Sequence, residues 1–213
     1  MGISEHDVSL PLDLETIFSS HADNHDALLN AFMPAFCDHV QADRIFLQPR
    51  NPKTRVCKIL RWRRNENIPW PAIPGDIKEG QWFVEDNWEI EDPLWRAALE
   101  LKPSIYVEDL EQAAKEKILN LDFEKNYMFH TAFIHAHAHW PQLYPSAPPS
   151  SLAHIIAGNE RDFYGSVQPA VFNGPQVWPS ETREFVERCL VRIAPIMKAY
   201  GESAPPRSSF EAK

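Results

Sequence analysis

The segment Tyr127–Trp140 constrains the fold of this chain more than any other, because it reads as a strand with two different faces. Its second part, Phe133-Ile-His-Ala-His-Ala-His-Trp140, alternates histidine with small or apolar residues. On a strand, residues i, i+2 and i+4 point to the same side of the sheet. We therefore expect one face lined by histidine, and an opposite face of small residues that lets a helix approach closely.

Helical periodicity marks both ends of the chain. Apolar side chains recur at spacings of three and four within residues 23–41, and again after Ser180, which we expect to cap the last helix. A shorter helix is expected over residues 12–19, and Pro34 and Pro195 should kink the two long helices. The two stripes consist of Leu29, Phe32, Phe36 and Val40, and of Val186, Leu190, Ile193 and Met197.

Strands and short helices are expected between these ends. Residues 43–50 and 55–62 flank a turn and predict an antiparallel hairpin. Residues 65–91 are irregular and rich in tryptophan, and Asp92 with Pro93 is typical of a helix start. A strand over 104–108 and a helical segment over 109–126 then precede the histidine strand. Residues 141–151 are expected to form a loop and 152–172 further strand, where Pro169 favours an edge position or a bulge.

This order of elements predicts an α+β domain, with an antiparallel sheet and helices layered on it. We expect one domain over residues 12–200, after a flexible lead at 1–11. The polar, Pro- and Ser-rich segment 201–213 is expected to be a disordered tail.

Composition excludes several function classes. The net charge of -9 disfavours binding to nucleic acid or to an anionic membrane surface. No signal peptide and no run of apolar residues long enough to cross a membrane is recognisable, so we expect a cytoplasmic protein. The chain has no GxGxxG and no Walker-type phosphate loop. Its three cysteines, Cys37, Cys57 and Cys189, are widely spaced and are expected to be small core residues in a reducing compartment.

Three phrases of the sequence resemble the GAF family of sensory domains. Residues 28–47 are similar to the family's first helix and first strand, and residues 91–99 with 105–110 to its middle helix and a short strand. Tyr164-Gly-Ser-Val, followed by Trp178-Pro-Ser-Glu and an amphipathic helix, resembles its last strand, turn and closing helix. The resemblance implies that the first and last helices cover one face of the sheet, while loops and middle helices roof a pocket on the other. It also implies a homodimer through the terminal helices.

The family uses that pocket for cyclic nucleotides, bilins, haem, other small effectors, or nothing. This chain has no cysteine between residues 58 and 188, so the covalent bilin attachment of some members is not expected. Methionine sulfoxide reductases of the family need cysteines in pocket loops, and a cyclic-nucleotide motif is not recognisable either. Residues 141–162 look like an insertion between the last strands.

The candidate ligand-contacting residues are the alternating histidines and the aromatic residues near them. A His-x-His pair on a strand can hold a metal, yet same-face neighbours lie about 7 Å apart, so all three histidines cannot easily reach one ion. They can equally line a polar pocket or contact an organic or haem-like ligand. Aromatic walls with a few polar groups are typical of a small-molecule pocket, and also of a loop anchored on a sheet. We single out His135, His137, His139, Phe133, Trp82 and Trp95.

The sequence thus predicts a non-enzymatic sensory or regulatory module that binds an unidentified small effector or a protein partner. No catalytic residue is assigned, because no acidic cluster is paired with a base or a nucleophile. We expect no attached output domain, so that the signal passes to a separate protein. Two alternatives stay open: a metal-dependent enzyme using His135, His137 and His139, and a ligand-free scaffold or assembly factor.

Overall fold

The computed structural model describes residues 8–71, 80–128, 130–140, 162–172 and 174–210. They form a five-stranded antiparallel sheet in the order β3-β1-β7-β6-β5, and a two-stranded sheet of β2 and β4. The predicted α+β class is confirmed. The strands are β1 (Arg44–Pro49), β2 (Val56–Lys58), β3 (Leu60–Arg63), β4 (Trp82–Val84), β5 (Ile105–Val107), β6 (Ala132–Trp140) and β7 (Asp162–Val171).

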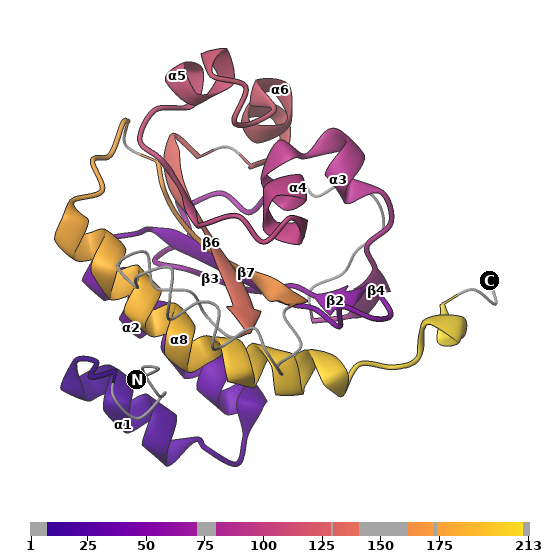
Figure 1. Ribbon diagram of the computed structural model, residues 1–213. Helices are drawn as coiled ribbons and strands as arrows, with labels where there is room; N and C mark the ends of the chain where they lie inside the picture. The colour runs from indigo at the N-terminus through magenta and orange to yellow at the C-terminus, as the bar shows by residue number, and fades with distance from the viewer. Residues whose placement is uncertain (1–7, 72–79, 129, 141–161, 173, 211–213) are drawn as a thin grey trace, which may run out of the picture.

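Three helices cover one face of the five-stranded sheet: α1 (Leu12–Ser20), α2 (His25–Val40) and α8 (Ser180–Glu202) (Figure 1). The apolar stripes of α2 and α8 pack against the inward residues of the strands, as the periodicity predicts, and α1 packs mainly on α2. Ala136 and Ala138 of β6 are fully buried beneath these helices. At Gly165 a Cβ atom would lie 2.1 Å from the Gln48 carbonyl oxygen and 2.6 Å from the Met197 methyl group, so only glycine allows this contact. Small residues therefore determine how closely the helices approach the sheet.

Short helices lie on the opposite face of the sheet (Figure 1). They are α3 (Trp88–Glu91), α4 (Pro93–Leu99), α5 (Leu110–Lys115), α6 (Leu121–Phe123) and a π-helical turn (Glu124–Met128). The expected start of α4 is confirmed, since the Leu94 amide donates to the Asp92 carboxylate at 2.8 Å. The helical segment expected over 109–126 is present but broken: α5 ends at Lys115, and Asn120 caps a second helix by accepting from the Phe123 amide.

The expected strand over 55–62 is divided between the two sheets. β3 pairs with β1 as predicted, whereas β2 pairs with β4. The cause is Glu85, which follows β4: its amide donates to the Arg55 carbonyl, and its carboxylate binds the Arg55 side chain. These contacts hold β2 beside β4 rather than in the main sheet.

Of the two alternatives expected for Pro169, an edge position or a bulge, the edge position is wrong: β7 lies between β1 and β6 in the middle of the sheet. The β6–β7 pairing holds at Phe133–Ala170 and resumes at Ala136–Val167. The interruption lies beside Pro169, which has no N–H to donate. A proline is therefore accommodated in a central strand by a gap in one ladder.

The ends of the domain and the start of the last helix also differ from the prediction in detail. Ser180 is the first residue of α8 and makes no capping hydrogen bond. Val8 and Leu10, within the expected lead, are buried in the helix-side core. After α8 a short 3-10 helix (Arg207–Ser209) follows, and Arg207 pairs with Asp86. The boundaries at residues 12 and 200, the flexible lead and the disordered tail stay predictions.

Parts of the sequence analysis lie outside the described residues. These are the loop over 141–151, the strand over 152–161, the bulk of the insertion at 141–162, and residues 72–79 of the irregular segment. Within the described residues, no helix is both long and apolar enough to cross a membrane.

Candidate functional site

A cavity of about 150 Å³ lies on the face of the sheet opposite to α1, α2 and α8. Its floor comes from β1, β7 and β6, and its roof from α3, the start of α4, α6 and the π-helical turn. Aromatic and apolar side chains predominate, with a few polar ones among them. The lining residues are Phe46, Gln48, Ile59, Trp88, Glu91, Asp92, Trp95, Phe123, Met128, His135 and Gln168.

The polar groups of the cavity floor follow from the alternation of side chains along the strands. Phe46 and Gln48 alternate on β1 with residues that face the helices, and Phe46 is paired with Gln168 of β7. His135 follows Phe133 on the same face of β6, within the gap that Pro169 leaves in the ladder. Gln168 and His135 therefore both face the cavity at the centre of the sheet.

The histidines of β6 form a chain of hydrogen bonds rather than a cluster around one point. His135 Nδ1 lies 2.8 Å from His137 Nε2, and His137 Nδ1 lies 2.8 Å from the Lys102 carbonyl oxygen. His139 Nε2 is 3.3 Å from the same oxygen. The chain runs from the cavity towards the segment after α4. His137 consequently has both ring nitrogens engaged with protein groups.

This chain determines the tautomers. The Lys102 carbonyl can only accept, so His137 Nδ1 carries the hydrogen and donates it. Burial lowers the pKa of His137 to about 4, and it lowers the pKa of His135 well below its ordinary value. Both rings are therefore neutral at pH 7, His137 Nε2 is an acceptor, and His135 Nδ1 donates to it. Nε2 of His135 is then left as a second acceptor.

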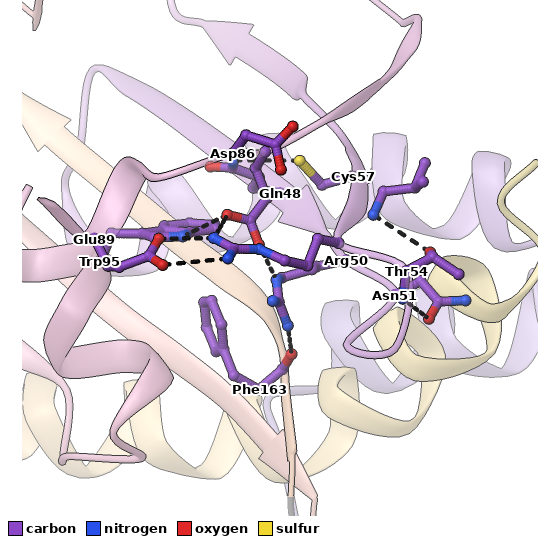
Figure 2. Close-up of polar contacts among 12 residues, drawn as sticks. Gln48, Arg50, Asn51, Thr54, Cys57, Asp86, Glu89, Trp95 and Phe163 are labelled. Carbon is purple, nitrogen blue, oxygen red and sulfur yellow. Dashed lines mark hydrogen bonds and ion pairs between the residues drawn. The ribbon is translucent and has the colours of Figure 1, made fainter. Parts of the chain in front are cut away.

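A buried carboxylate fixes one wall of the cavity. Glu85 accepts hydrogen bonds from Arg50 at 2.7 Å and from Arg55 at 2.8 Å, while Trp95 Nε1 donates to it at 3.2 Å. Arg50 also donates to the Phe163 carbonyl, and Arg55 reaches Glu89 (Figure 2). Because Glu85 is fully buried, these partners are needed to offset the desolvation of its charge. The Trp95 ring is thereby held in one orientation.

A second set of titratable groups lies near the roof. Burial raises the pKa of Asp92 to about 7 and the pKa of Glu124 to about 8, and the nearby Glu124 raises that of Asp92 further. His130 Nε2 lies 2.6 Å from Glu124, and the Arg44 guanidinium donates to the Met128 carbonyl. Burial lowers the pKa of Arg44 to about 9. This side of the cavity therefore contains groups that titrate near neutral pH.

The structure brings only part of the predicted site together. His135 and Trp95 line the cavity, whereas His137 and His139 lie further along β6 at Lys102. The Phe133 ring stacks on His130 at a centroid distance of 4.3 Å, outside the lining.

Trp82 lies apart from these residues. Its ring contacts Tyr200 of α8 and packs against the helix-side core. Whether any of the six residues contacts a ligand stays a prediction.

Several lining residues escaped the sequence analysis. Gln48 and Gln168 are the clearest cases, because a glutamine on a buried strand is a polar group in need of a partner. For Gln48 this signal was present in the sequence, because the residue lies at an alternating position of the strand expected over residues 43–50. For Phe123 and Met128 the sequence contained no such signal. Their orientation depends on the break of the helical segment at Asn120.

The structure offers no evident metal centre. Among the described residues, no group of three or more His, Cys, Asp or Glu side chains is placed to hold a metal ion. All three cysteines are buried thiols, and burial raises the pKa of each, which leaves them protonated and unreactive. The prediction that they are small core residues is confirmed.

Comparisons with known proteins address the fold. No family model and no curated protein matches the sequence. Solved structures do match, among them the GAF domain of an Acinetobacter phosphoenolpyruvate-protein phosphotransferase, with 10% identity, a TM-score of 0.56, and coverage of 91% of this chain and 95% of that one.

Two light-sensing proteins match similarly. One is the phycocyanobilin-bound GAF domain of a cyanobacterial phytochrome, with 9% identity, a TM-score of 0.53, and coverage of 91% of this chain and 97% of that one. The other is the third GAF domain of a Synechocystis protein in its photoproduct state, with 12% identity, a TM-score of 0.54, and coverage of 84% and 95%. At such low sequence identities, the structural match is evidence for the fold alone. This chain therefore has the fold of a GAF domain.

Proposed function

We propose that the chain is a non-enzymatic sensory or regulatory module, which binds a small effector in the cavity between the sheet and α3, α4 and α6. The observation that carries the proposal is the cavity itself. It combines aromatic walls with a few buried polar groups, which is the usual composition of a small-molecule site. Some proteins of the same fold hold a ligand, such as the phycocyanobilin-bound phytochrome domain.

The size of the cavity favours a ligand of one or two rings. An engineered protein cavity of similar volume holds one benzene molecule. A bilin, with four pyrrole rings, needs far more room than about 150 Å³. Since no cysteine is among the described lining residues, the effector would be held by non-covalent contacts.

Catalysis is a weaker interpretation of the same residues. His135 is the only imidazole among the described lining residues, and its lowered pKa makes it a poor base at pH 7. The lining includes no serine or cysteine next to it that could act as a nucleophile. Binding without turnover therefore suits the cavity better.

We further propose that effector binding is passed to a separate protein, and that the chain forms a homodimer through its terminal helices. Sedimentation equilibrium at micromolar concentration tests the second point. A monomer mass under those conditions would eliminate the dimer, while the cavity proposal would be unaffected.

Native mass spectrometry of the freshly purified protein tests the binding proposal, with the denatured mass as reference. We expect excess mass in the native spectrum, or its appearance after incubation with a library of one- and two-ring metabolites. A Gln168→Trp variant fills the floor of the cavity and should lose this mass. Gln112→Trp, on exposed α5, introduces the same ring elsewhere and should keep it.

Two results would refute the proposal. One is that neither the purified protein nor the incubated protein ever carries a ligand. The other is that Gln168→Trp retains the ligand as fully as Gln112→Trp does, while circular dichroism shows both variants folded.

A further inference from the structure

Resting on the proposed function, we infer that the effector carries an N–H or O–H donor for His135 Nε2 and no anionic group. The acceptor is a consequence of the hydrogen-bond chain. His135 Nδ1 donates its hydrogen to His137 Nε2, and His137 Nδ1 donates to the Lys102 carbonyl. A neutral imidazole has one N–H, so Nε2 of His135 presents a lone pair.

That lone pair has no protein partner in the described part of the chain. The only side-chain hydrogen bond of His135 there runs from Nδ1, while the residue is 3% exposed and lines the cavity. Nε2 of His135 is not among the fully buried side-chain atoms that lack a partner, so it is open to the cavity. A ligand that displaces water there has to supply a donor, or it leaves this acceptor unpaired at a cost in free energy. His135 therefore favours a ligand that has a donor over a ligand that has none.

The rest of the lining restricts the ligand further. The described lining residues include no lysine or arginine to neutralise an anion, and Glu91 adds negative charge. The remaining walls are rings and aliphatic groups, among them Trp88, Trp95 and Met128. A flat, apolar molecule with one donor satisfies all of these contacts.

A metal ion is a poorer occupant of the same position. Protein-bound metals need several converging ligands, and no such group exists among the described residues. His137 is hydrogen-bonded to His135 and to the Lys102 carbonyl, and His139 contacts the same carbonyl. One lone pair alone suits a hydrogen bond better.

His137 acts as a positioning residue in this account. Its Nε2 accepts the hydrogen of His135 Nδ1, and so it determines which nitrogen of His135 faces the cavity as an acceptor. Replacing it by phenylalanine frees His135 to carry the hydrogen on either nitrogen. A glutamine at this position retains a carbonyl oxygen and can restore the acceptor.

The test compares indole with benzofuran by isothermal titration calorimetry. The two rings have nearly the same shape, but benzofuran has an oxygen where indole has its N–H. We expect the wild-type protein to bind indole about tenfold more tightly, because benzofuran leaves Nε2 unpaired. His135→Phe should bind both rings with similar affinity. His137→Phe should reduce the preference and His137→Gln should retain it.

The outcomes separate this inference from the proposed function. Equal or tighter binding of benzofuran by the wild type overturns the donor preference and leaves the cavity proposal standing. A preference for indole that persists unchanged in both His135→Phe and His137→Phe overturns it as well. If neither ring binds and native mass spectrometry finds no ligand, the cavity proposal fails and this inference with it.

Discussion

The two faces of the main sheet differ in the kind of residue that each one buries. The face under α1, α2 and α8 is closed by apolar side chains such as Phe32, Ile45 and Ala136. Buried polar and charged residues of the described chain gather instead on the opposite face and at its margins, with Glu187 of α8 as the exception. They are Arg44, Gln48, Arg50, Glu85, Glu124, His130, His135, His137, His139 and Ser166.

This difference indicates that the two faces of the sheet contribute in different ways to the molecule. Apolar burial is non-directional and adds stability roughly in proportion to the area removed from water. Buried polar groups need partners at defined distances and are costly without them, so they fix geometry more than they add stability. We infer that the helix-covered face holds the fold together and that the opposite face orients the cavity.

The largest expected effect is a loss of stability on the helix-covered face. Phe32→Ala removes a fully buried ring that stacks on Phe36 at 5.0 Å. We expect it to lower the free energy of unfolding by about 4 kcal/mol, as deletion of a buried ring usually does. Urea denaturation measures the change. Indole should bind the folded variant with unchanged affinity, and a marked loss of affinity would contradict the division between the faces.

The second-largest effect is expected when a buried ion pair on the cavity face is broken. Glu85→Gln leaves Arg50 and Arg55 without their shared carboxylate. We expect a loss of about 3 kcal/mol in urea denaturation, because the Arg50 charge stays buried and unpaired. Indole affinity should also fall, since the single oxygen of the glutamine amide cannot accept from Arg50, Arg55 and Trp95 as the carboxylate does, and the Trp95 ring is then held less firmly.

Glu89→Gln provides the matched control for that change. Glu89 pairs with the same Arg55 but is half-buried, so its loss should cost less than about 1 kcal/mol. Equal effects of the two substitutions would show that burial of Glu85 does not determine the energetics.

A pH-dependent effect on stability is expected from Asp92. Its pKa is raised to about 7, mainly by burial, so the folded protein holds a proton that the unfolded chain releases above pH 4. This contribution to stability is present at low pH and is lost as the pH rises from about 4 to about 7. Asp92→Asn keeps the cap and cannot titrate, so its stability relative to wild type should increase over that range. A difference that is constant with pH would contradict the raised pKa.

A small effect on stability is expected from His135→Phe. The substitution conserves a ring but removes the donor to His137 Nε2, and we expect a cost of about 1 kcal/mol in urea denaturation. Its effect on ligand preference, the loss of a roughly tenfold difference in affinity, corresponds to about 1.4 kcal/mol. A loss above 3 kcal/mol would place His135 among the residues that hold the fold together.

The sequence predicted most of what depends on periodicity. The stripes of the terminal helices, the start of α4 at Asp92 and the two faces of β6 follow from spacing and capping alone. Contacts between distant segments were not predictable in this way. The division of residues 55–62 depends on Glu85, and the central position of Pro169 depends on a gap in one ladder.

The candidate site shows the same limit. Alternation placed the histidines on one face, but it could not show that His137 turns to Lys102 while His135 faces the cavity. Trp82 and Trp95 lie in comparable sequence surroundings, yet one packs against α8 and the other lines the cavity. Their positions are decided by tertiary partners, namely Tyr200 and Glu85.

The most direct test of the account is an NMR titration of protein labelled with ¹³C at its methionine methyl groups. Met128 lines the cavity, whereas Met33 and Met197 are buried in the helix-side core. On addition of indole, we predict a saturable shift of the Met128 signal and little change at Met33 and Met197. A shift of the two core signals with Met128 unchanged would place the ligand on the other face of the sheet and contradict the account.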